Sequence, residues 1–118
     1  MNEIVKKIEK KYPECTRELL DNAEKAYELF CKKQSDYGDN NIKLGLDISS
    51  SLHDKVLSQL GVVIRMNDKI QRLLNIHKKI IFEDQGESVT DESLEDTCLD
   101  LMNYSNILLV LLKGKWGK

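Results

Sequence analysis

The side chains best suited to chemistry form an acidic row near the C-terminal end of the sequence. Its members are spaced four, four and three residues apart, so a helix would place them all on one face: Glu92, Asp96, Asp100 and Asn103. Like charges at this spacing repel one another, so solvent, basic partners or a divalent cation must offset the repulsion. Magnesium prefers oxygen ligands and often binds carboxylates together with substrate phosphates. The row indicates either a magnesium site or an exposed polar face, and the pattern alone favours the exposed face.

A second group of charged residues lies in the middle of the chain. Its members recur at threes and fours, which places them on one helical face: Arg65, Asp68, Lys69 and Arg72. Asp68 could bind a metal ion while the three bases hold phosphate oxygens. The alternative is a surface of salt bridges, which is common and which we favour for this group taken alone.

The segment Asp36-Tyr37-Gly38-Asp39-Asn40-Asn41 is a third candidate. Tyr37 could stack on a nucleobase, and Gly38 permits a tight turn. The segment lacks the spacing and the closing Glu of a calcium-binding EF-hand loop, and ordinary turn chemistry is the alternative. The chain has no phosphate-binding P-loop, no GxGxxG sequence, and no Ser or Cys nucleophile beside a His in a known motif.

Helices must position these residues, because apolar residues recur at threes and fours along most of the chain. The pattern predicts an all-α domain over residues 1–118, with helices over 2–11, about 14–34, 51–82 and 91–112. Residues 35–50 contain Gly, Asp, Asn and Ser and are predicted to be a long loop. Ser51 and Asp54 resemble a capping box at the start of the helix over 51–82. Gly61 lies inside that helix and indicates close packing by another backbone.

The apolar stripes identify the expected core. The stripe of the helix over 51–82 is Leu52, Val56, Leu60, Val63, Ile64, Ile70, Leu73 and Leu74. The stripe of the last helix is Leu94, Cys98, Leu101, Leu108 and Leu112. We expect Cys98 to be a buried thiol and Trp116 to be a packing anchor.

Composition restricts the class of protein to which the chain can belong. The 118-residue chain has a net charge of −2, which argues against binding to a nucleic acid polymer. Its three cysteines are odd in number and form no CxxC pair, so we expect free thiols and a cytoplasmic protein. No segment approaches the roughly 20 apolar residues of a membrane span, so no membrane partner is expected. A bundle this short exposes apolar surface, so we expect a homodimer or a higher homo-oligomer.

Three stretches resemble a known family in their order as well as their type: DYGDNN, LGVVIRMNDKIQRLLNI and ESVTDESLEDTCLDLMNY. They resemble the nucleotide modification associated domain, type 1, which is found in phages and bacteria. The resemblance covers roughly residues 25–112. That family is similar to the MazG-like all-α nucleotide pyrophosphohydrolases, which include the dimeric dUTPases. The resemblance implies an oligomeric four-helix bundle that uses Mg²⁺ to cleave a nucleoside triphosphate into a monophosphate and pyrophosphate.

The resemblance also implies roles for the candidate residues. The metal ligands would be Asp100 and Asp96, followed by Glu92, Asp68 and Glu28. Asp68 and Asp96 are the candidates to orient the attacking water. The phosphates would be neutralised by Arg65, Lys69 and Arg72, and the base or ribose would contact Tyr37 and Asn103.

The sequence departs from the superfamily at two places. The superfamily has an acid three residues before the Asp that corresponds to Asp100, and here that position is Thr97. It also has an ExxE pair on an earlier helix, whereas this chain has Glu24 and Glu28 at a spacing of four. Three hypotheses follow: a magnesium-dependent pyrophosphohydrolase, a protein that binds and sequesters a nucleotide without cleaving it, and a helical adaptor.

Overall fold

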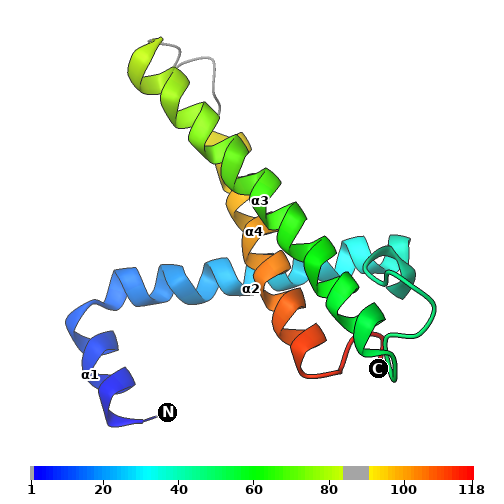
Figure 1. Ribbon diagram of the computed structural model, residues 1–118. Helices are drawn as coiled ribbons and strands as arrows, with labels where there is room; N and C mark the ends of the chain where they lie inside the picture. Colours follow the sequence, from blue (N-terminus) through cyan, green and yellow to red (C-terminus); the bar gives the residue numbers. More distant parts are fainter. Residues whose placement is uncertain (1, 84–90) are drawn as a thin grey trace.

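The computed structural model describes residues 2–83 and 91–118, and only the backbone of residues 91–93. The described chain is all-helical, which confirms the predicted fold class, and its elements are shown in Figure 1. They are α1 (Glu3–Lys11), α2 (Pro13–Tyr37), the short 3₁₀ helix η1 (Asp39–Asn41), α3 (Leu52–Phe82) and α4 (Asp91–Leu112).

Local sequence explains where the helices begin. The Asn2 side chain accepts a hydrogen bond from the Val5 amide at 3.0 Å and caps α1. The Ser51 hydroxyl accepts a hydrogen bond from the Asp54 amide at 3.2 Å, which confirms the first of the two hydrogen bonds of the predicted capping box of α3. The Asp54 carboxylate does not return to Ser51. It accepts from two loop amides instead, those of Leu46 and Asp47, each at 2.9 Å.

The predicted loop over 35–50 starts too early. α2 continues to Tyr37, because the Gln34 carbonyl still accepts a hydrogen bond from the Gly38 amide at 2.9 Å. Gly38 then ends the helix with a φ of 72°, a conformation that residues with a Cβ rarely adopt. Tyr37 is therefore the last residue of a helix, and the loop proper begins after it.

The helices form an open arrangement. α3 and α4 pack side by side, and α2 crosses them, while α1 contacts α2 alone among the described elements (Figure 1). The radius of gyration is 17.5 Å, larger than the ~13 Å of a compact chain of about 100 residues. Within one chain, the helices do not close into a compact bundle.

The core lies where α3, α4, the loop after α2 and the segment after α4 meet. Its fully packed members are Ile42, Val62, Ile107, Leu111 and Trp116. The prediction that Trp116 is a packing anchor is confirmed, since 7% of this residue is exposed. Its ring packs edge-to-face against Phe30, with 6.1 Å between ring centroids.

The predicted stripes do not match the buried faces. On α4 the buried residues are Thr97, Leu99, Ile107 and Leu111. Cys98 is exposed and Leu112 is 60% exposed, so both predictions are wrong. α4 contacts α2 as well as α3. Because the helix packs on two sides, its buried residues differ from the single stripe that the sequence predicted.

On α3 the buried residues are Ser58 and Val62, while most of the predicted apolar stripe faces outward. Gly61 is closely approached, as expected, but by a side chain rather than a backbone. A Cβ at this position would lie 2.8 Å from Leu44 Cδ1. In the part of the chain that the structure describes, no helix combines the length and apolarity needed to cross a membrane.

Candidate functional site

Four hydrogen bonds hold the loop that follows α2 against α3 and against the segment after α4. The buried Ser58 hydroxyl accepts from the Leu44 amide at 2.8 Å and donates to the Leu44 carbonyl at 3.2 Å. Arg65 donates to the Asn41 carbonyl at 2.9 Å. The Trp116 indole donates to the Asp39 carbonyl at 2.8 Å. These contacts place the end of α2 and the start of the loop over the middle of α4.

Asp100 is the centre of the site. Its Oδ1 lies 2.9 Å from the Lys33 ammonium of α2, and its Oδ2 lies 2.9 Å from the Lys69 ammonium of α3. Only 18% of the Asp100 side chain is exposed. One carboxylate therefore joins three helices, and both of its oxygens accept charge-assisted hydrogen bonds.

The opposite charges of Asp100 and the two lysines stabilise one another and shift the pKa values of Asp100 and Lys33. Burial by itself would raise the pKa of Asp100, but hydrogen bonds from Lys69 and Lys33 and the charges of both lysines lower it below its usual value. The hydrogen bond to Asp100 raises the pKa of Lys33. Asp100 is therefore a carboxylate at neutral pH, and Lys33 is an ammonium.

A small hollow of about 70 Å³ lies beside this group, and we call it the basic hollow. Its polar lining consists of Lys33, Gln34, Tyr37, Asn41, Arg65, Asp100, Asn103 and Tyr104. Together with Lys69, which is bound to Asp100, the group carries three positive charges and one negative charge, a net of +2. The chain as a whole has a net charge of −2, so positive charge is locally concentrated here.

One residue that lines the basic hollow, Asn41, has a buried side-chain atom without a hydrogen-bond partner among the described residues. This atom is the side-chain oxygen. A buried acceptor without a donor is costly, so such groups usually meet a water or a ligand.

The structure brings together five of the residues that the sequence analysis selected. Tyr37, Arg65, Asp100 and Asn103 line the basic hollow, and Lys69 is bound to Asp100. These residues come from α2, α3 and α4, so the three separate sequence features converge on one place.

The remaining selected residues lie elsewhere or outside the description. Asp96, Asp68, Arg72 and Glu28 are exposed and do not line the basic hollow. The side chain of Glu92 lies outside the described residues. Among the described side chains, no three His, Cys, Asp or Glu residues gather closely enough to hold a metal ion. With both Asp100 oxygens bound to lysines, the described residues of one chain do not fit the expected magnesium site.

Lys33 and Tyr104 belong to the site but were not selected from the sequence, and Asn41 was part of the third candidate segment without a role of its own. Lys33 lies four residues before Tyr37, so the helical spacing could have placed both on one face had α2 been extended to Tyr37. No comparable signal marks Asn41, because its position depends on how the loop folds.

Comparison of the chain with family models, with curated proteins and with solved structures gives no match. The function of the site must therefore be argued from its own geometry.

Proposed function

We propose that this protein binds a nucleotide and holds its phosphates at the basic hollow. The observation that carries the proposal is the net positive group of Lys33, Lys69, Arg65 and Asp100 in a chain that is acidic overall. Ammonium and guanidinium groups bind phosphate oxygens through charge-assisted hydrogen bonds. Tyr37 and Asn103 line the same hollow and supply a hydroxyl and a carboxamide for hydrogen bonds to the sugar or to the phosphates.

Magnesium enters this proposal with the nucleotide. A nucleoside triphosphate binds Mg²⁺ through its own phosphate oxygens, and the ion keeps several waters when proteins bind it. Protein carboxylates are therefore not required to form a complete cage around the ion.

Binding without cleavage is the form of the proposal that the geometry favours. Asp100 would have to leave both lysines before it could bind a metal ion or orient a water, and each contact is 2.9 Å long. Pyrophosphohydrolysis is the second candidate, and the placement of Asp96 one helical turn from Asp100 on α4 favours it. The helical adaptor offers no role for the concentrated positive charge.

Purified protein should be incubated with ribonucleoside and deoxyribonucleoside triphosphates and with cyclic nucleotides, with and without Mg²⁺. Mass spectrometry of the solution and of the denatured protein then separates the three candidates. We expect an intact nucleotide to be released on denaturation. A monophosphate and pyrophosphate that form only with Mg²⁺ would establish hydrolysis, and the absence of any bound or altered nucleotide would favour the adaptor.

We also propose that the protein is a homodimer joined along α3. Eight exposed positions of this helix are spaced alternately four and three residues apart. We call this row the α3 seam: Val56, Leu60, Val63, Asn67, Ile70, Leu74, His77 and Ile81. Six of the eight are apolar, and this alternation is the heptad pattern by which two helices pack against each other.

The identity of the residues favours a second copy as the partner of the α3 seam. The spacing places Leu60, Asn67 and Leu74 at the heptad position a, and Val56, Val63 and Ile70 at the position d. Leucines at a with β-branched residues at d favour bundles of more than two helices. Asn67 lies near the middle, where a polar residue fixes the register of the packed helices. Two α3–α4 pairs would then form a four-helix bundle from two chains.

A further inference from the structure

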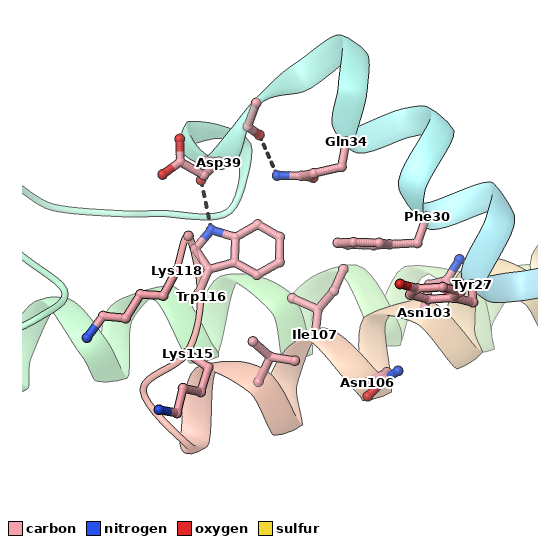
Figure 2. A pocket seen from close by; sticks show the side chains of 13 residues that line it. Tyr27, Phe30, Gln34, Asp39, Asn103, Asn106, Ile107, Lys115, Trp116 and Lys118 are labelled. Atoms are coloured by element: carbon pink, nitrogen blue, oxygen red, sulfur yellow. Dashed lines mark hydrogen bonds between the residues drawn. The ribbon is translucent and has the colours of Figure 1, made fainter.

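A cavity of about 440 Å³ lies between α2, α4 and the segment after α4 (Figure 2). Aromatic side chains make up much of its wall: Tyr27, Phe30 and Trp116. Figure 2 shows Phe30 edge-on beside the indole, with Tyr27 farther along α2. Pockets of this volume accommodate small organic ligands. We call it the aromatic cavity.

The aromatic cavity adjoins the basic hollow. Four residues line both: Phe30, Gln34, Asn103 and Ile107. A molecule that entered the aromatic cavity would therefore lie beside Lys33, Arg65 and Asp100 on the other side of this shared wall. The two spaces together fit a molecule with a flat apolar part and an anionic part.

Polar groups lie around the aromatic walls. Asn103 and Asn106 come from α4, and Gln34 comes from α2, where its amide donates to the Gly38 carbonyl at 2.7 Å. Each carboxamide offers both a donor and an acceptor, which is what the edge of a heterocyclic base requires. A hydrocarbon chain offers no group that could pair with these carboxamides, so the lining favours a base over a lipid or an aliphatic ligand.

We infer that the aromatic cavity binds the base of the nucleotide whose phosphates contact the basic hollow. This inference rests on the proposed function, and it assigns the base to a site that the sequence analysis did not select. Tyr27 has an exposed fraction of 64%, which leaves its ring available for stacking on a base. Asn103, on the shared wall, lies between the base and the phosphates.

The chain carries its own reporter, because Trp116 is its one tryptophan and it lines the aromatic cavity. Its fluorescence should be followed while the four common deoxynucleoside triphosphates, the matching deoxynucleosides and inorganic tripolyphosphate are added separately. Calorimetry measures the same affinities without depending on the indole. We expect at least one nucleotide to change the fluorescence and to bind more tightly than tripolyphosphate.

Tyr27→Ala tests the stacking ring, and Tyr12→Ala is the matched control, because Tyr12 is also exposed and lies outside the aromatic cavity. We expect Tyr27→Ala to weaken nucleotide binding about tenfold and to leave tripolyphosphate binding unchanged. Tyr12→Ala should change neither. Asn106→Ala, at an exposed position, should alter the preference among the four bases.

The outcomes separate this inference from the proposed function. Nucleotides that bind wild type, Tyr27→Ala and Tyr12→Ala equally and leave the fluorescence unchanged would overturn the inference while the proposed function stands. Deoxynucleosides that bind as tightly as their triphosphates and quench Trp116 would support the cavity and contradict phosphate binding. If no probe binds, both are overturned.

Discussion

At the scale of single residues, Asp100 decides between the candidate functions. Its carboxylate is held between the ammonium groups of Lys33 and Lys69, each at 2.9 Å. In a phosphate site this carboxylate is a counter-ion that competes with the ligand for the lysines. In a metal site the same carboxylate is a ligand that the ion requires. Removing its charge therefore has opposite effects in the two cases.

We predict that Asp100→Asn strengthens binding of inorganic tripolyphosphate about fivefold to tenfold in the absence of Mg²⁺. The variant frees two ammonium groups and raises the net charge of the site by one unit. Calorimetry at low and high salt measures the effect, which salt should reduce. Weaker binding in the variant would count against the phosphate site, provided that circular dichroism shows that the helices are retained.

Single residues were also where the sequence was least informative. The sequence placed Asp100 and Arg65 on helices, but it could not show that Lys33 and Lys69 both bind Asp100. That arrangement depends on the crossing of α2 over α4 and on the packing of α3, which helical spacing alone does not determine. Glu28 and Asp96 have equally suitable spacing, yet they lie on exposed faces.

At the scale of elements, the loop between α2 and α3 depends on carboxylates that accept backbone hydrogen bonds. Asp47 accepts from the hydroxyls and amides of Ser49 and Ser50, and these bonds lower its pKa to about 2. The Asp47 amide and the His53 ring lower the pKa of Asp54, which also accepts from the Leu46 amide. The ordinary pKa of both is near 3.8.

We predict that the protein loses stability as the pH falls from about 4 to about 2. A carboxyl group whose pKa is lower in the folded than in the unfolded protein stabilises the fold at any pH above its unfolded pKa. This stabilisation is lost as the pH falls through the folded pKa. Urea unfolding followed by Trp116 fluorescence at several pH values measures the loss. Asp47→Asn should show a shallower dependence in this window, and identical pH profiles for the two proteins would contradict the assignment.

A second prediction concerns the glycine of the same loop. Gly45 has a φ of 88°, and a Cβ there would lie 2.3 Å from the Asp54 carboxylate. We expect Gly45→Ala to lower the free energy of unfolding by about 1–3 kcal/mol for the backbone, with a further loss from the displaced carboxylate. Gly38→Ala is the matched control, because its φ is 72° but nothing lies within 4 Å of a Cβ there. Equal losses in the two variants would show that the Asp54 contact is unimportant.

The existence of the long helices was the part of this structure that the sequence predicted best. The 3.6-residue periodicity and the capping residues of α3 are local properties, and they were sufficient to expect long helices. The end of α2 was misplaced because Gly38, rather than the polar residues before it, terminates the helix. The buried faces were misjudged because burial depends on how many neighbours a helix has.

At the scale of the whole molecule, the main feature is the amount of apolar surface left uncovered. The core of one chain is small, and Leu19, Leu20 and Leu60 are among the large apolar residues that are at least half exposed. Soluble monomers rarely expose large continuous apolar surfaces. The stripe predicted on α3 is an apolar face, but the prediction that it belongs to the core is wrong for the single chain, because most of its residues are exposed.

We predict that the wild-type protein sediments as a dimer and that Ile70→Glu in the α3 seam produces a monomer. Glutamates placed opposite each other in such a seam repel and lose their hydration. Leu46→Glu is the control, because Leu46 is fully exposed and lies in the loop. Analytical ultracentrifugation at several protein concentrations measures both. A monomeric wild type, or a variant that remains dimeric, would show that α3 does not form the interface.

The most direct test of the central claim compares two lysines of α2 that lie two helical turns apart. Lys33 binds Asp100 in the basic hollow, whereas Lys25 pairs with Glu95 outside it. Calorimetric titration with a nucleoside triphosphate and Mg²⁺ should show affinity reduced about tenfold or more in Lys33→Gln and unchanged in Lys25→Gln. Equal affinities in the two variants and the wild type would contradict the assignment of nucleotide phosphates to the basic hollow.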